Sequence, residues 1–288
     1  MPARFGEVAE RLRRLTVRVL THGNSAQGSG SGVIWNADGT LVTNAHVVQD
    51  VVRDKAEVEL WDGTSLPAEV AERDPRRDLA RLKLRVANLP ALSWRASASL
   101  RPGEAVMAIG NPLGFIGALT TGVARACGPV RGWDSRDWIQ ASIRLAPGNS
   151  GGPLADSEGR VLGINTLVVS SRSGPLGLAV PSDSVADFLK RGARPALGVV
   201  VRPVANPPFQ TALLVLDVAS DSLADYASLK TGDLLISANG REFGSANDLG
   251  AALDNSAGNI LRLRFLRGDR RIEREVSVAL PGGRREAA

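Results

Sequence analysis

Short runs in which apolar and polar residues alternate recur along most of the chain, and this period of two is typical of β-strands with one buried face. The first run is 16–22, and later runs flank turn sequences such as Asn36-Ala37-Asp38-Gly39 and Asp62-Gly63. Further strands are expected at 33–35, 40–43, 58–61, 65–71, 120–127, 213–218, 261–265 and 272–278, and another element begins in the apolar run 105–114. The pattern therefore predicts a chain dominated by β structure.

Four other segments are predicted to be helices. Residues 5–15 place Phe5 and Leu12 on one apolar face, and residues 182–191 gather Val185, Phe188 and Leu189 in the same way. Residues 222–229 and 245–255 are the other two. Gly192-Ala193-Arg194-Pro195 ends the second helix and predicts a linker, so we expect one domain at 1–194 and another at 195–282.

Composition excludes several classes of function. The 288 residues are 43% hydrophobic, which suffices for two or three packed cores. The one cysteine, Cys127, rules out an internal disulfide and is expected in the core. No Cys and His cluster is present, so we expect neither a metal nor a cofactor. The net charge of +5 comes from scattered arginines without interleaved aromatic residues, so no nucleic-acid partner is expected.

The pattern also bears on the cellular location. No apolar stretch reaches membrane-spanning length, so we expect no transmembrane segment. The first residues lack the apolar core of a secretory signal. The location is unknown; we expect a cytoplasmic protein by default, with the cell envelope as the alternative if the chain is processed or truncated.

A glycine-rich run, Gln27-Gly28-Ser29-Gly30-Ser31-Gly32, has the composition of a phosphate-binding loop. Such a loop leads from a strand into a helix, whereas Val33-Ile34-Trp35 continues here as a strand. We therefore reject a phosphate site at this run.

The segment 146–154 sets Ser150 among small residues that permit a tight turn. Such a turn can expose a hydroxyl beside free backbone N–H groups, as an acyl-transfer nucleophile requires. A serine nucleophile also needs a histidine that takes its proton and a carboxylate that orients the histidine. His46 follows an apolar strand and is the candidate base, whereas His22 is interpreted as a surface turn residue.

Two carboxylates compete for the orienting role. Asp78 stands directly before the alternating run 79–84 and can be partly buried. Asp74 precedes Pro75 in a charged turn and is expected to be solvated. The pattern therefore favours Asp78.

Three segments, in chain order, resemble the catalytic segments of the HtrA/Deg serine proteases. They are Thr43-Asn44-Ala45-His46-Val47-Val48, Asp78-Leu79-Ala80-Arg81-Leu82 and Gly148-Asn149-Ser150-Gly151-Gly152-Pro153-Leu154. The resemblance, which extends over about 28–280, implies a chymotrypsin-like double β-barrel. It implies that Ser150 is the nucleophile, His46 the base and Asp78 its orienting carboxylate. The N–H groups of Gly148 and Ser150 would form the oxyanion hole.

The resemblance also indicates a substrate pocket. Its walls would be formed by strands that contain Thr166 and Leu178, and its base by the residues before the nucleophile, Arg144 and Leu145. An inward-facing Arg144 would favour an acidic substrate side chain. An outward-facing Arg144 would leave a preference for small aliphatic side chains.

The C-terminal segment resembles a PDZ domain, an α+β fold, in Leu229-Lys230-Thr231-Gly232-Asp233-Leu234-Leu235 and Asn239-Gly240. The resemblance implies that the loop at Leu197 and Gly198 receives a peptide C-terminal carboxylate. The peptide would add as a strand beside Val199 to Val201, with its last side chain near Leu249 and Leu253. The alternative is that 197–201 is an internal strand.

The family implies a serine endopeptidase that degrades unfolded or misfolded polypeptides in protein quality control. It also implies a homotrimer or a multiple of trimers, for which Phe5 and Leu12 are candidate contacts, with burial of both on their own domain as an equal alternative. Two alternatives stay open from the sequence. One is a chaperone-like protein whose site is inactive or resting, and the other is a peptide-sensing module in which the PDZ domain controls the protease.

Overall fold

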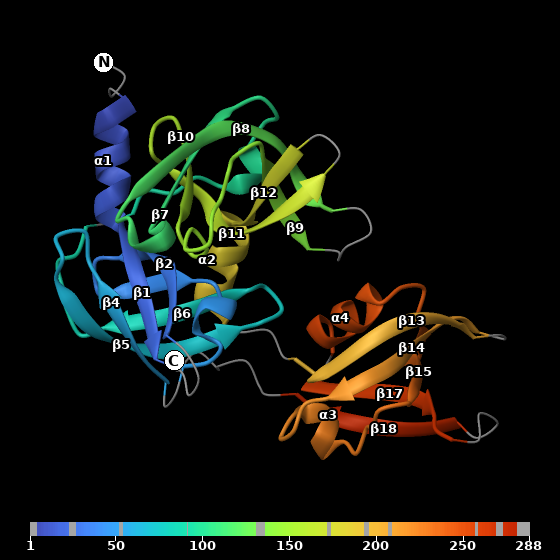
Figure 1. The fold of residues 1–288 in the computed structure, drawn as a ribbon. Coiled ribbons are helices and arrows are strands. Elements are labelled where there is room, and N and C mark those ends of the chain that lie inside the picture. The colour runs from blue at the N-terminus through green and yellow to red at the C-terminus, as the bar shows by residue number, and fades with distance from the viewer. Residues whose placement is uncertain are drawn as a thin grey trace. The chain divides into compact units, whose positions relative to one another are not determined.

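The computed structural model describes residues 5–22, 27–51, 54–90, 92–130, 136–171, 174–192, 196–206, 209–256, 259–268 and 273–280. The chain divides into two compact units, 1–193 and 194–288 (Figure 1). Within the described ranges, none of the helices combines the length and the hydrophobicity needed to cross a bilayer.

The N-terminal helix α1 (Phe5–Leu15) is amphipathic, as the sequence predicts. Its buried residues Val8, Leu12 and Leu15 pack with side chains of the second barrel, whereas Phe5 is 54% exposed. The partners on that barrel are Met107, Ile109, Ala155 and Val161. The helix is therefore part of the first unit and covers one side of it.

Six antiparallel strands close into a first barrel in the order β1-β2-β3-β6-β5-β4. They are β1 (Thr16–His22), β2 (Gln27–Asn36), β3 (Thr40–Thr43), β4 (Lys55–Glu59), β5 (Ser65–Asp74) and β6 (Leu79–Leu84). Alternating residues point inward, and the interior consists of aliphatic side chains such as Val19, Leu41 and Leu82.

A second set of six antiparallel strands closes in the order β10-β11-β12-β9-β8-β7. They are β7 (Ala105–Gly110), β8 (Ala118–Pro129), β9 (Asp137–Ala141), β10 (Pro153–Asp156), β11 (Val161–Ser171) and β12 (Gly174–Pro181). Among the described residues, 3₁₀ helices lie between strands at η1 (His46–Val48), η3 (Ser97–Ser99) and η4 (Pro112–Gly114). The expected chymotrypsin-like double barrel is therefore confirmed.

The two barrels share one apolar cluster. Helix α2 (Ser182–Arg191) contributes Val185 and Phe188 to this cluster. The first barrel supplies Val33, Trp35, Val42 and Leu79, and the second supplies Trp138, Ile164, Leu178 and Val180. Packing of this kind fixes the barrels against each other, so side chains from both can be held at fixed distances.

One expectation for this unit is wrong. Cys127 is exposed rather than in the core. It lies on β8, where alternate residues face outward, while Ala124 on the other face is buried. Partial desolvation still raises the pKa of the Cys127 thiol above its ordinary value.

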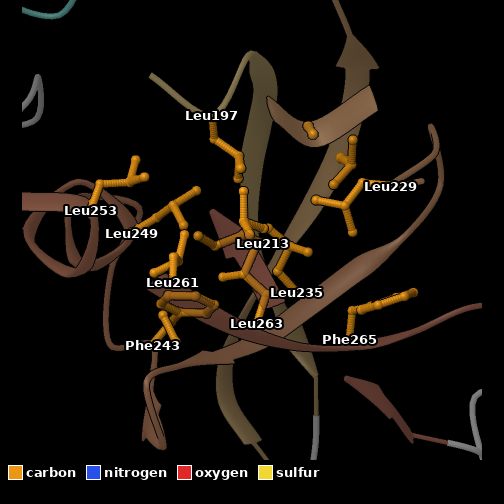
Figure 2. Packing of buried hydrophobic residues seen from close by; sticks show 14 of the residues in the cluster. Leu197, Leu213, Leu229, Leu235, Phe243, Leu249, Leu253, Leu261, Leu263 and Phe265 are labelled. Atoms are coloured by element: carbon orange, nitrogen blue, oxygen red, sulfur yellow. The ribbon is translucent and has the colours of Figure 1, made fainter. Parts of the chain in front are cut away.

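The second unit is a sheet in the order β13-β14-β15-β17-β18, with β16 paired to β15. Its elements are β13 (Val199–Asn206), β14 (Phe209–Val218), α3 (Leu223–Tyr226), β15 (Leu234–Ala238), β16 (Arg241–Glu242), α4 (Asn247–Asp254), β17 (Ile260–Leu266) and β18 (Glu273–Ala279). Figure 2 shows Leu249 and Leu253 of α4 in the same core as Leu197 and the sheet residues Leu213 and Leu261.

Candidate active site

His46 and Asp78 form a pair where β3 ends and β6 begins. The imidazole Nδ1 of His46 lies 2.9 Å from each carboxylate oxygen of Asp78, and the His46 backbone N–H donates to Oδ1 at 3.1 Å. A carboxylate only accepts, so Nδ1 carries the proton and Nε2 of the neutral ring is a proton acceptor. The His46 side chain is 44% exposed and thus accessible to another molecule. The side chain of the other histidine, His22, lies outside the described residues.

The backbone of Asp78 is held in an uncommon conformation. Its φ is 55°, in the left-handed region that Asp tolerates better than most residues. The buried side chain of Asn44 donates from Nδ2 to the Asp78 carbonyl oxygen at 2.8 Å. The strand end that supplies His46 therefore also fixes the residue that orients it.

Asp74 is fully buried, so the expectation of a solvated carboxylate is wrong. Its Oδ1 accepts the backbone N–H of Arg77 at 3.0 Å, and its Oδ2 lies 3.3 Å from Arg77 Nη1. Arg77 also pairs with Asp187 and donates to the Gly192 carbonyl at 3.2 Å. A buried carboxylate is tolerated when a cation and an N–H group compensate its charge. Here the bonds between Asp74 and Arg77 stabilise the turn that leads to Asp78.

Thr166 of β11 connects the two sides of the site. Its hydroxyl donates to Oδ2 of Asp78, and its carbonyl oxygen accepts the Ser150 hydroxyl at 2.7 Å. Among the described residues no hydrogen bond joins Ser150 to His46. The sequence indicated Thr166 only as a pocket residue. Because its contact with Asp78 spans 88 residues of chain, no local pattern could have revealed it.

The residues before Ser150 form a type II turn. The Asn149 N–H donates to the Ala146 carbonyl at 3.0 Å, Pro147 occupies the second position, and Gly148 follows with a φ of 101°. Within the described ranges, the N–H groups of Gly148 and Ser150 donate to no protein group. Two unpaired N–H groups beside one hydroxyl can stabilise a developing oxyanion.

Gly151 shows why small residues surround the serine. It has a φ of 89°, and a Cβ there would overlap the Ser31 carbonyl oxygen of β2. Its N–H donates to the Asn165 carbonyl at 2.8 Å. The segment around Ser150 thus fits between β2 of the first barrel and β11 of the second only without a side chain at this position.

The residues predicted to line a substrate pocket lie in different environments. Thr166 contacts Asp78 and Ser150 as described, and Leu145 is half-buried. Arg144 is exposed, whereas Leu178 is fully buried in the cluster between the barrels. Their assignment to a pocket stays a prediction. Within the described ranges no group of three or more His, Cys, Asp or Glu side chains could hold a metal ion.

The residues predicted to bind a peptide come together in the second unit. Leu197, Leu249 and Leu253 belong to one buried cluster, with Val199 and Val201 packed against it (Figure 2). Gly198 precedes β13 with a φ of 81°, and a Cβ there would overlap Ser222. Strand β13 pairs only with β14 in the described sheet, so its other edge is available for an added strand.

One of the two closed six-stranded barrels carries the paired His and Asp, and the other carries the serine turn. This combination defines a trypsin-like peptidase domain. Residues 30–164 match the family model described as trypsin-like peptidase domain. The chain belongs to the HtrA/Deg family.

Relatives and solved structures support the assignment to this family. The chain is 40% identical over 233 residues to a "Probable periplasmic serine endoprotease DegP-like" of Chlamydia pneumoniae, covering 75% of this chain and 47% of the relative. It is 35% identical over 274 residues to the protein of that name in Pseudomonas putida, covering 89% and 57%. The chain thus spans about half the length of the curated relatives it matches.

Two solved structures extend the similarity over nearly the whole chain. One is the HtrA-type protease AlgW with a decapeptide, at 26% identity and a TM-score of 0.66, covering 99% of this chain and 100% of that one. The other is a serine endoprotease from Yersinia pestis, at 26% identity and a TM-score of 0.66, covering 97% and 98%.

Proposed function

We propose that the protein is a serine endopeptidase of the HtrA type. The observation that carries the proposal is the geometry around Thr166, which contacts the carboxylate of the His46–Asp78 pair through its hydroxyl and the Ser150 hydroxyl through its carbonyl. These groups come from both barrels in the chain order of the family's catalytic segments. Family membership and the DegP-like relatives support the same reaction.

The reaction begins with a change of partner at Ser150. The hydroxyl leaves the Thr166 carbonyl and donates instead to Nε2 of His46, a hydrogen bond of the kind that often forms only with substrate bound. His46 then takes the proton as Ser150 attacks the scissile carbonyl, and it later returns that proton to the leaving amine. Asp78 holds the imidazole in the required tautomer and stabilises the imidazolium.

The negative charge that develops on the substrate oxygen is assigned to the N–H groups of Gly148 and Ser150. The type II turn supports this role because, within the described ranges, it leaves both N–H groups without a protein acceptor beside the Ser150 hydroxyl. Water then enters in place of the leaving amine, and the same groups act in reverse to release the second product.

The second unit is proposed to be a PDZ domain that recognises peptide C-termini. Within the described ranges, the N–H groups of Leu197 and Gly198 donate to no protein group, and such groups can receive a terminal carboxylate. The unpaired edge of β13 supplies the main-chain bonds for an added strand. The similarity to the protease AlgW, solved with a decapeptide, supports peptide binding.

Substrates are proposed to be unfolded or misfolded polypeptides, in the context of protein quality control. A site of this type needs the substrate backbone extended through it, which folded chains seldom offer. A homotrimer or a multiple of trimers is proposed from family membership, and the exposed Phe5 at the start of α1 is a candidate contact. Light scattering that shows only monomer would count against the trimer.

The decisive experiment compares cleavage of casein by the wild-type protein and by Ser150→Ala, with a fluorophosphonate probe as a second readout. We expect the wild type to cleave and to be labelled, and the variant to do neither. Labelling that persists in Ser150→Ala would refute the assigned nucleophile. For the second unit, fluorescence polarisation should detect a peptide with a free C-terminal carboxylate and not the same peptide with an amidated C-terminus.

A further inference from the structure

The glycine-rich run at the start of β2 lies against the serine turn. Ser31, in the middle of this run, is fully buried. A Cβ at Gly30 would lie 2.7 Å from a methyl carbon of Val47 and 3.3 Å from the Ser150 carbonyl oxygen. The glycine permits the close approach of β2 to the segment that carries Ser150. The run therefore serves packing at the site rather than binding of phosphate.

The hydroxyl of Ser31 joins three segments. The Asn111 backbone N–H donates to Ser31 Oγ at 2.8 Å, and Ser31 Oγ lies 2.6 Å from the Gly148 carbonyl oxygen. A hydroxyl has a single proton. Because Ser31 Oγ accepts the Asn111 N–H, it donates its one proton to the Gly148 carbonyl oxygen. The carbonyl of Gly148 is thus held by a side chain of the other barrel.

The backbone of Ser31 holds the other half of the turn. Its N–H donates to the Ser150 carbonyl at 2.8 Å, and its own carbonyl accepts the Thr43 hydroxyl at 2.6 Å. One residue of the first barrel therefore bonds to both Gly148 and Ser150. These are the two residues whose N–H groups are assigned to the oxyanion hole.

We propose that Ser31 is a positioning residue that sets the separation and direction of the two oxyanion donors. This inference rests on the proposed function, since the donors matter only for an acyl-transfer reaction. The hydrogen bond from the Ser31 N–H to the Ser150 carbonyl does not depend on the Ser31 side chain, whereas the hydrogen bond to the Gly148 carbonyl does. Removing the hydroxyl therefore frees Gly148 and leaves Ser150 in place.

The chain offers a matched control at Ser182. Its buried hydroxyl donates to the Arg95 carbonyl at 2.7 Å and accepts the Ser97 backbone N–H at 3.1 Å. This is the same bonding pattern as at Ser31, including a buried N–H that loses its acceptor when the hydroxyl is removed. Ser182 begins α2 and makes its bonds away from the serine turn. Ser31→Ala and Ser182→Ala should therefore lose similar stability.

The experiment measures kcat, KM and thermal unfolding of both variants in the full chain. We expect Ser31→Ala to lose about 10- to 100-fold in kcat with KM changed less than about threefold, because misplacing a donor acts on the transition state. We expect Ser182→Ala to keep its kcat at a comparable Tm. Equal losses of kcat in the two variants would overturn the proposal, because a purely structural role predicts that result.

A second readout does not depend on cleavage. Hydrogen exchange of the Asn149 amide reports the bond that closes the turn, and we expect it to be at least about tenfold faster in Ser31→Ala only. An unchanged Asn149 exchange rate would overturn the proposal for Ser31. If the wild type neither cleaves casein nor reacts with the probe, the proposed function fails, and the exchange measurement then decides only whether the Ser31 hydroxyl holds the turn.

Discussion

Removal of the Thr166 hydroxyl tests whether the contact between β11 and Asp78 contributes to catalysis. In Thr166→Val the Asp78 carboxylate loses a donor from a side chain that is 3% exposed. A hydrogen bond to a charged group contributes about 1.5–3 kcal/mol. If the whole contribution were realised in the transition state, kcat/KM would fall by about 10- to 150-fold, which sets the upper limit.

The Ser150 contact is a useful internal control. It involves the Thr166 carbonyl, which the substitution leaves unchanged. Thr166→Ser keeps the hydroxyl and should remain within a few-fold of the wild type. Thr16→Val removes another buried threonine hydroxyl, which donates to the Leu12 carbonyl at 2.9 Å, and should lower stability without a specific effect on turnover.

The assay is steady-state cleavage of a peptide substrate, with unfolding followed by circular dichroism. We expect the order wild type, Thr166→Ser, Thr166→Val in kcat/KM, and a normal kcat/KM for Thr16→Val below its Tm. A Thr166→Val variant within threefold of the wild type, at equal stability, would refute the reasoning. The same holds if Thr166→Ser is as impaired as Thr166→Val.

Three other changes have expected outcomes. Gly151→Ala places a Cβ against a β2 carbonyl oxygen at a φ of 89°, so we expect loss of labelling by a fluorophosphonate. Arg77→Met leaves the buried Asp74 without its guanidinium, which should cost about 3–5 kcal/mol and lower the Tm by roughly 6–20 °C. The hydrogen bond from Arg95 lowers the pKa of Glu104 below its ordinary 4.5, so this pair stabilises the folded state above that pH. The Tm difference between wild type and Glu104→Gln should therefore close as the pH falls below 4.5.

Local patterns in the sequence predicted the elements well. The helix at 182–191 is confirmed at both ends, a helix is present at 5–15, and the alternating runs are strands of the two barrels and of the second unit. Short apolar periods and turn residues determine such elements locally. The expected helix at 222–229 is shorter, Leu223–Tyr226, with Ser222 accepting the Asp225 N–H as its cap.

Long-range contacts were harder to predict. Asp74 looked solvated because the turn around it is charged, yet one of those charges, Arg77, folds back on it. Ser31 was considered only as part of a phosphate loop, and its bond to Gly148 spans 117 residues of chain. The three segments that resemble the family indicated His46, Asp78 and Ser150. The residues that hold them in place lie on strands whose local sequence carries no sign of the contact.

The division of the site between two barrels also has a consequence for biosynthesis. His46 and Asp78 lie on the first barrel, whereas Ser150 and Thr166 depend on strands up to β12, which ends at Pro181. A nascent chain therefore contains His46 and Asp78 long before Ser150 is in position. Pairings of such long sequence separation form late in folding. Under the proposed function, the cutting site is therefore absent until the chain up to Pro181 has been synthesised and folded.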